Sequence, residues 1–320
     1  MIRVANEETI KDVGEFGLIE RVTGQLSMPA SVSVGPGDDS AVFSVDGDAV
    51  VSTDMMVEDV HFRRDWCSGF DVGCKLIARS FADLEAMGAT SRGCVVAISM
   101  PEELQAEWFK DFFQGVSAEV VKARAVLVGG DITSGEKIVA TATVFGQMEG
   151  RAPVLRSGAK PGDVVALCGR QGWAAAGWAT LSRGFRSPRA AVDAYRCPEV
   201  PYGAGRIAAA AGANAMIDVS DGLIADLGHI AEKSNVLIDI DSSSLEIPGP
   251  LQNVGAALNS DPLNFVLTGG EDHPLVATFA DYVPQGWAQI GRVLDPVEGS
   301  ANVLVDGEEW ETEYSGWTHF

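Results

Sequence analysis

Short acidic segments beside glycine or hydroxyl residues are the part of this sequence best suited to chemistry. Five of them occur, at 35–40, 52–54, 129–131, 217–222 and 269–272, and most adjoin β-branched, apolar runs. The pattern predicts that the acids lie where strands end and loops begin, which is where ligand chemistry is commonly found. Carboxylates that converge with little local Lys or Arg repel one another unless a cation neutralises them. Because Mg²⁺ binds through a few carboxylates and substrate phosphates, the pattern indicates magnesium-assisted phosphate chemistry.

Several of these residues also have an ordinary structural explanation. Asp38 and Asp39 follow Gly-Pro-Gly and would serve as turn formers. Asp221 precedes a helix expected near Leu223, so its side chain would act as the N-cap. The same helix start would also offer backbone N–H groups to an anion. His61 stands alone, and a lone histidine is more often structural, so spacing by itself leaves both explanations open.

Asp83 lies in a segment that is too apolar for a fully solvated helix face. Lys75 and Arg79 precede it at helical spacing, so the three side chains share one face of the predicted helix. A solvated salt bridge is the usual explanation of such a triplet. Because residues 76–89 are mostly apolar, a functional role for Asp83 is an equally good hypothesis.

Composition limits the class of protein and of partner. The chain has 320 residues, 46% of them hydrophobic, which is enough for about two domains with separate cores. A net charge of −22 argues against a nucleic-acid partner, because the phosphate backbone would be repelled. No apolar run is long enough to span a membrane, and the first residues lack a secretory core. Five cysteines without a Cys-x-x-Cys pair are typical of reduced thiols, so we expect a cytoplasmic protein.

The expected fold is a two-domain α+β protein. A mixed-sheet domain over 1–148 is followed by an α+β domain over 149–320, with Pro, Gly and Ser clustered at the boundary. In the first domain, apolar spacing predicts helices over 71–87 and 104–123, a hairpin about Asp46-Gly-Asp48, and a strand over 125–128 that delivers Gly-Gly-Asp as a loop. In the second, strands are expected at 164–168, 215–219, 236–240, 265–267 and 275–279, and helices from 173 and over 223–233.

Other catalytic patterns are absent or weak. The sequence holds no phosphate-binding Walker loop, no protein-kinase pattern and no dinucleotide-binding pattern. Asp46-Gly-Asp48 and Asp239-Ile-Asp241 have the spacing of an aspartyl phosphatase nucleophile. A hairpin turn explains the first and polar residues at a strand end explain the second.

Taken together and in order, the segments resemble the thiamine-monophosphate kinase family, within the superfamily named for aminoimidazole ribonucleotide synthetase. The similarity runs from Gly14-Glu-Phe-Gly to the final Trp317-Thr-His-Phe320. The matching motifs are Gly-x-Gly-Asp-Asp at 35–39, Ser-Thr-Asp-x-x-Val at 52–57, His-Phe at 61–62, Asp-Leu-x-Ala-Met-Gly-Ala at 83–89, Gly-Gly-Asp at 129–131, Arg-Ser-Gly-Ala-Lys-Pro-Gly-Asp at 156–163, Asp-x-Ser-Asp-Gly-Leu at 218–223 and Gly-Gly-Glu-Asp at 269–272. Any one motif is weak, but all of them in this order are specific.

The resemblance implies ATP-dependent phosphorylation of thiamine monophosphate to thiamine diphosphate with several Mg²⁺ ions. The residues at the family's metal-ligand positions are Asp38, Ser52, Thr53, Asp54, Asp83, Asp131, Asp218 and Asp221, of which Asp54, Asp83 and Asp131 are expected to be catalytic. The implied ATP contacts are Gly130, Asp131, Arg156 and Ser220, and the implied substrate contacts are His61, Glu271 and Trp317. The resemblance also implies a homodimer in which the amino-terminal domains share a β-barrel.

Two departures from the family pattern bear on substrate fit, and two other functions remain as alternatives. His273-Pro274 stands where the family commonly has Tyr-Glu, and Trp317 stands where a Tyr is frequent. The alternatives are a sibling ATP-dependent synthetase and a non-catalytic acidic protein that binds Mg²⁺ and nucleotide.

A phosphate acceptor is already ionised and needs no general base. A kinase of this kind therefore accounts for many carboxylates without a Ser-His or Cys-His pair.

Overall fold

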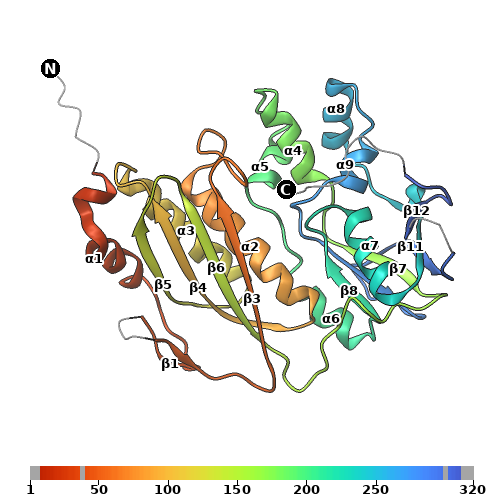
Figure 1. The fold of residues 1–320 in the computed structure, drawn as a ribbon, viewed down its shortest axis with the longest axis horizontal. Helices are drawn as coiled ribbons and strands as arrows, with labels where there is room; N and C mark the ends of the chain where they lie inside the picture. The colour runs from red at the N-terminus through yellow and green to blue at the C-terminus, as the bar shows by residue number, and fades with distance from the viewer. Residues whose placement is uncertain (1–7, 37–39, 298–301, 311–320) are drawn as a thin grey trace. The chain divides into compact units, whose positions relative to one another are not determined.

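The computed structural model describes residues 8–36, 40–297 and 302–310, and these fold into two compact units (Figure 1). The first unit extends to Phe81 and resumes over Ser91–Glu149, and the second comprises Ala82–Thr90 and the chain from Gly150 onward. Both contain helices and a β-sheet, which confirms the expected two-domain mixed α/β architecture. The functions predicted for 1–148 and 149–320 remain predictions.

A four-stranded mixed sheet forms the centre of the first unit. Its strand order is β3-β6-β4-β5, with bounds β3 Ala49–Val57, β4 Thr90–Met100, β5 Leu127–Ser134 and β6 Val139–Gln147. β3 and β6 are antiparallel, and β4 and β5 are parallel. A separate two-stranded sheet is made by β1 Val32–Val34 and β2 Val42–Phe43.

Helices α2 and α3 pack tightly together on one face of that sheet. The unit's helices are α1 Ile10–Thr23, α2 Gly69–Ala86 and α3 Ala106–Lys122. Glycines allow the close approach of α2 and α3, because an added Cβ at Gly73 would lie 2.0 Å from the Phe112 carbonyl oxygen. Figure 1 shows both helices behind the strands. The opposite face carries exposed apolar side chains, among them Val51 and Met55.

A six-stranded sheet lies between two layers of helices in the second unit. Its order is β12-β9-β11-β7-β10-β8, with bounds β7 Val164–Cys168, β8 Ala215–Asp218, β9 Leu237–Ile240, β10 Leu275–Phe279, β11 Ala288–Leu294 and β12 Val303–Val305. The helices are α4 Trp173–Ser182, α5 Arg189–Arg196, α6 Ala204–Ala210, α7 Leu223–Ser234, α8 Gly249–Leu258 and α9 Leu263–Thr268, with a 3₁₀ turn η1 at Ser242–Ser244.

Side chains that alternate between the two faces of these strands build two separate hydrophobic cores. Ile217 and Val276 join the core beneath α7, whereas Met216 and Ala277 join a second core beneath α6. Successive side chains of a strand point to opposite faces, so a strand buried on both faces reads as a continuous apolar run. This is why the buried runs at 164–168, 215–219 and 275–279 predicted strands correctly.

Three local predictions were wrong. The runs flanking Asp46-Gly-Asp48 do not form a hairpin, because β2 pairs with β1 and β3 pairs with β6. Gly129-Gly-Asp131 lies inside β5 rather than in a loop after it, and residues 265–267 belong to helix α9. In each case long-range pairing and packing override the local signal. The helices predicted over 71–87, 104–123 and 223–233 are confirmed as α2, α3 and α7.

Across the residues placed by the structure, we find no helix with the length and apolar character needed to cross a membrane.

Candidate active site

Two loops of the second unit are bound together by their backbones. The β8–α7 loop holds Val219 to Gly222, directly after Asp218 at the end of β8, and the α9–β10 loop holds Gly269 to Pro274. The amide of Glu271 donates to the Ser220 carbonyl at 2.8 Å, and the amide of His273 donates to the Val219 carbonyl at 3.1 Å. Two motifs distant in the sequence thus become neighbours, which places predicted ATP and substrate residues side by side.

Glycine is required where these loops cross. A Cβ at Gly270 would lie 2.2 Å from the Ser220 carbonyl oxygen. Gly222 has a φ of +136°, and a Cβ there would lie 2.7 Å from the Thr268 carbonyl oxygen. Both positions exclude any larger residue, so the glycines of the two motifs have a structural reason.

Asp218 is buried and bonded to a histidine. Its Oδ2 lies 3.0 Å from Nδ1 of His273, and both residues are almost fully buried. His273 adopts a left-handed φ of 54°, as does Glu271 with a φ of 71°. The residue that departs from the family pattern is therefore a direct partner of a predicted metal ligand, a contact that sequence analysis missed.

Asp226 holds the start of α7. Its Oδ2 accepts hydrogen bonds from the amides of Ser220, Asp221 and Gly222 at 3.0, 3.0 and 3.1 Å. Burial raises the pKa of Asp226 to about 7, and the negative charges of Asp218 and Asp221 act in the same direction. These amides are therefore occupied, which contradicts the prediction that they are open to an anion.

The N-cap explanation of Asp221 is also wrong. Gly222 is the N-cap of α7, and as a glycine it has no side chain of its own to cap the helix. Because Asp221 does not cap the helix, its carboxylate stays a candidate for the metal-ligand role that the family resemblance implies.

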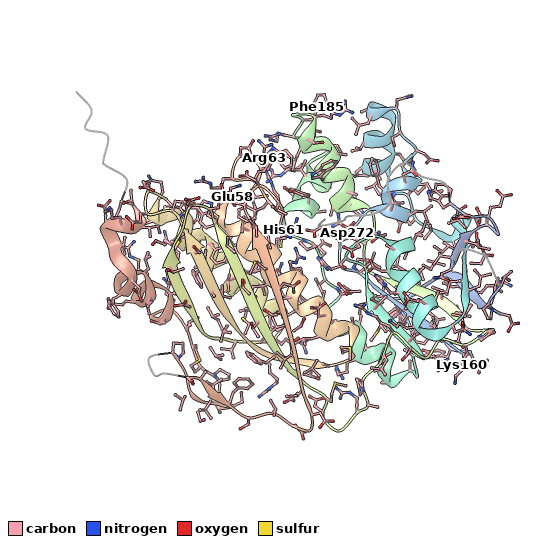
Figure 2. The ribbon with its side chains drawn as sticks, in the orientation of Figure 1. Glu58, His61, Arg63, Lys160, Phe185 and Asp272 are labelled. Carbon is pink, nitrogen blue, oxygen red and sulfur yellow. The ribbon has the colours of Figure 1, made fainter. Side chains whose placement is uncertain are left out.

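The aspartate of Gly-Gly-Glu-Asp has a structural role. Oδ1 of Asp272, labelled in Figure 2, accepts a hydrogen bond of 2.8 Å from the amide of Ala174 in the first turn of α4. Burial raises the pKa of Asp272 to about 7. Gln171 donates to the carbonyls of Val266 and Gly269. Asp272 and Gln171 together anchor the loop that presents Glu271.

In the first unit, Ser52 and Asp54 share the face of β3 that meets the helices. The Nε atom of Arg79 on α2 lies 3.5 Å from Oδ1 of Asp54. Oδ2 of Asp54 is buried and has no hydrogen-bond partner among the residues that the structure describes. Thr53 points to the other face, where its hydroxyl donates to the Ala142 carbonyl at 3.1 Å. The hydroxyl of Thr53 is thus separated from the Asp54 carboxylate.

His61 lies in a well-anchored turn after β3. Its Nδ1 accepts a hydrogen bond of 3.0 Å from the Val57 amide, which leaves the proton of the neutral ring on Nε2. Glu58 holds the turn by accepting from Arg64 and from the Ile138 amide. Figure 2 shows Glu58, His61 and Arg63 together at this end of β3.

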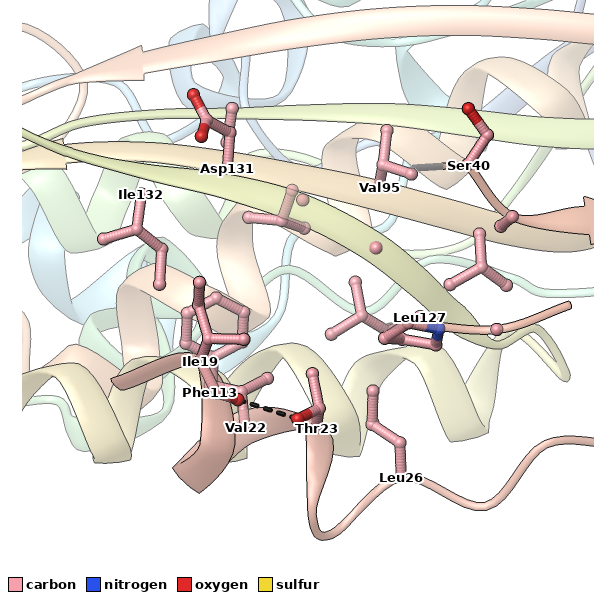
Figure 3. A pocket seen from close by; sticks show the side chains of 18 of the residues that line it. Ile19, Val22, Thr23, Leu26, Ser40, Val95, Phe113, Leu127, Asp131 and Ile132 are labelled. Atoms are coloured by element: carbon pink, nitrogen blue, oxygen red, sulfur yellow. Dashed lines mark hydrogen bonds between the residues drawn. The ribbon is translucent and has the colours of Figure 1, made fainter. Parts of the chain in front are cut away.

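A hollow of about 690 Å³ lies beside β5 (Figure 3). Ile19, Phe113 and Phe145 contribute apolar walls, and Gly130 and Asp131 line the hollow on β5. In Figure 3 the side chains of Asp131 and Ile132 point to opposite sides of the strand. The volume is within the range of small-molecule sites, and the described part of the lining combines apolar walls with the carboxylate of Asp131.

Asp131 and Asp54 lie on opposite faces and opposite edges of the four-stranded sheet. Asp131 is in register with Ala97, an exposed residue, whereas Asp54 faces α2 through Arg79. β6 and β4 separate their strands, so the backbones are about 14 Å apart at a spacing of about 4.8 Å per strand. One chain does not bring these two carboxylates together.

Asp83 and Arg156 are placed by two further anchors. Glu85, two residues after Asp83 on α2, accepts from the amides of Gly203 and Gly205 at 2.9 and 3.1 Å. The carbonyl of Arg156 accepts from Ser234 at the last residue of α7. A helix of this length spans about 18 Å, so the backbone of Arg156 lies far from Ser220 at the other end.

Asp38 and Trp317 lie outside the described residues. Of the contacts above, those of Glu85, Asp226, Asp272 and His273 were not predicted from the sequence. For Asp226, the sequence signal that could have predicted its contact is the Asp-Gly-Leu-x-x-Asp spacing that ends in this residue. Acids are favoured in the first turn of a helix.

Comparison with known proteins identifies the family. The chain matches the models for the AIR synthase related protein, N-terminal domain, over residues 37–148, and C-terminal domain, over residues 160–303. It is 49% identical over 314 residues to the thiamine-monophosphate kinase of Mycobacterium tuberculosis, covering 98% of this chain and 93% of that one. The chain belongs to the thiamine-monophosphate kinase family.

Solved structures of this family share the fold. The thiamine-monophosphate kinase of Stenotrophomonas maltophilia superposes with a TM-score of 0.79 at 30% identity, covering 91% of this chain and 95% of that one. AaThiL in complex with AMPPCP and TMP gives a TM-score of 0.78 at 28% identity, covering 99% and 100%. The resemblance to the thiamine-monophosphate kinase family is thus confirmed over nearly the whole chain.

Proposed function

We propose that this chain transfers the γ-phosphoryl group of ATP directly to the phosphate of thiamine monophosphate, forming thiamine diphosphate. The observation that carries the proposal is the pair of bound loops that sets Ser220 and Asp221 beside Glu271, on a chain of the thiamine-monophosphate kinase family. A relative solved with an ATP analogue and TMP supports both substrates.

The chemistry requires positioning more than proton transfer. The acceptor phosphate is ionised at neutral pH, so the main obstacle is bringing two polyanions into line. Asp54, Asp83 and Asp131 are the residues we propose for catalysis, because they would hold cations that neutralise the charge of the phosphates. His61, Glu271 and Trp317 are proposed to hold thiamine monophosphate. No nucleophile is needed in a direct transfer.

The donor set fits Mg²⁺. The buried Oδ2 of Asp54, which has no hydrogen-bond partner in the described part of the chain, is a costly group that a bound cation would neutralise. Asp218 supplies a second buried carboxylate. We propose Asp38, Ser52, Thr53, Asp54, Asp83, Asp131, Asp218 and Asp221 as the residues that hold several ions. Bound Mg²⁺ supplies neutralisation of phosphate charge.

ATP is proposed to bind with its base in the hollow beside β5 and its phosphates toward the carboxylates. Flat apolar walls from Phe113 and Phe145 suit an adenine ring. Gly130 is exposed on the edge strand β5 and lines the hollow. A Cβ at Gly130 would lie 2.0 Å from the Val96 carbonyl oxygen, so this position stays a glycine. Arg156 and Ser220 are the remaining proposed ATP contacts.

A homodimer resolves the separation of Asp54 and Asp131. We propose that the uncovered sheet faces, with exposed Val51 and Met55, pair into the shared β-barrel. In a closed barrel the edge strand β5 of one copy would adjoin the edge strand β3 of the other, so Asp131 would lie beside the strand that carries Asp54 of the second copy. Burial of the exposed apolar face would favour the pairing.

Incubation of the purified protein with ATP, Mg²⁺ and thiamine monophosphate should yield thiamine diphosphate and ADP in equal amounts. Chromatography measures both products, and samples with EDTA or with free thiamine as acceptor are the controls. Free thiamine lacks the phosphate that the bridging ions require, so it should not react. Phosphate release without thiamine diphosphate would indicate a synthetase or hydrolase, and binding without turnover would indicate a non-catalytic protein.

Trp317→Ala should weaken the binding of thiamine monophosphate. Thiamine carries a cationic thiazolium ring, and an aromatic face stabilises such a cation by about 1–2 kcal/mol. We therefore expect its KM to rise roughly five- to thirty-fold while the KM of ATP stays unchanged. Steady-state kinetics with each substrate varied separately measures this. Equal rises in both KM values, or a lower Tm with neither changed, would make Trp317 a structural anchor.

A further inference from the structure

Asp226 is a buried acid whose role goes beyond starting a helix. One atom of its side chain, Oδ2, accepts hydrogen bonds from the consecutive amides of Ser220, Asp221 and Gly222. Only 2% of the residue is exposed, and α7 begins directly after these amides, at Leu223. A carboxylate that accepts several backbone N–H bonds makes strong, charge-assisted contacts.

The opposite side of the same loop is held by a different element. The Ser220 carbonyl accepts from the Glu271 amide, and Val219 exchanges two bonds with His273 and Pro274. The N–H groups are therefore held by α7 and the carbonyls by the α9–β10 loop. With the amides of residues 220–222 and the carbonyls of Val219 and Ser220 held, the backbone of the turn sets the Cα–Cβ directions of Ser220 and Asp221.

Three successive N–H groups that point to one place form a concavity that suits an anion. Here the chain's own carboxylate occupies it. An external anion therefore has no access to these amides, and the Ser220 hydroxyl and the Asp221 carboxylate are the side-chain groups that this loop can offer to a ligand.

We propose that Asp226 is a positioning residue, which fixes the Ser220–Gly222 turn so that Ser220 reaches ATP and Asp221 reaches a metal ion. This inference rests on the proposed function for the roles of those two side chains. It adds a residue that touches neither substrate and acts through the turn.

Asp226→Ala should raise the KM of ATP, and the Mg²⁺ concentration for half-maximal rate, each about ten-fold. Asp226→Asn should stay within about three-fold of wild type, because an amide oxygen accepts the same N–H bonds. Asp241→Ala is the matched control, since Asp241 accepts similar bonds from Ser243 but is exposed and outside the proposed site. All rates are measured below the Tm of the least stable variant.

Hydrogen–deuterium exchange of the segment 219–223 provides a readout independent of turnover. Faster exchange in Asp226→Ala than in Asp226→Asn, together with the raised ATP and Mg²⁺ requirements, would support the proposal. A lower Tm with unchanged requirements would overturn it and leave Asp226 as a helix-stabilising acid. If the wild type forms no thiamine diphosphate, the proposed function fails. In that case the role of Asp226 is decided by two measurements on the same variants: hydrogen–deuterium exchange of residues 219–223 and calorimetric titration with ATP and Mg²⁺.

Discussion

Asp54→Asn and Asp131→Asn are each expected to lower kcat by at least about 10²-fold, equal to roughly 2.7 kcal/mol of transition-state stabilisation. Each change keeps the side-chain shape but removes a charge that offsets Mg²⁺. Asp59→Asn is the control, because Asp59 is an exposed acid in a surface ion pair with Lys137, a contact of little energetic value. Near-wild-type rates in both site variants at saturating Mg²⁺ would mean that the carboxylates are structural.

Mixing the two inactive variants tests whether the site is shared between copies. If Asp131 of one copy completes the site with Asp54 of the other, a mixed dimer contains one site with both carboxylates intact. Random exchange of subunits should then restore about a quarter of wild-type activity. Mass spectrometry of the intact dimers checks that subunits have exchanged. A mixture of exchanged dimers that stays inactive would show that one chain supplies both residues, contrary to the arrangement proposed above.

Gly270→Ala is expected to abolish measurable turnover, with a loss of at least about 10²-fold, and to destabilise the fold by about 1–3 kcal/mol. A methyl group 2.2 Å from the Ser220 carbonyl oxygen must push the two bound loops apart. Glu271 would then move away from Ser220 and Asp221. Steady-state kinetics and thermal unfolding measure the two effects.

Gly228→Ala is the matched control for that substitution. Gly228 lies within α7, and a Cβ there meets nothing within 4 Å. Alanine favours a helix interior by up to about 1 kcal/mol relative to glycine, so this variant should be fully active and equally or more stable. If Gly270→Ala behaves like Gly228→Ala, the close approach of the two loops is not essential to the activity.

Sequence alone determined the elements whose signals are local. The apolar spacing of residues 71–87 predicted α2, and Gly88, two residues after the helix ends, has a left-handed φ of 71°. Buried apolar runs predicted β7, β8 and β10 for the same reason, because side-chain periodicity is a property of a short segment. The order of the acidic motifs was sufficient to indicate the family, which the comparisons confirm.

Tertiary structure alone decided what each acid of a motif does. In Gly-Gly-Glu-Asp, Asp272 anchors α4 and only Glu271 is presented, while Asp226 rather than Asp221 holds the start of α7. Strand order placed Asp54 and Asp131 on opposite edges and faces of one sheet. These facts depend on hydrogen bonds and strand pairings between residues far apart in the chain. Spacing along the sequence carries no information about such contacts, because it records only which residues share a turn or a strand face.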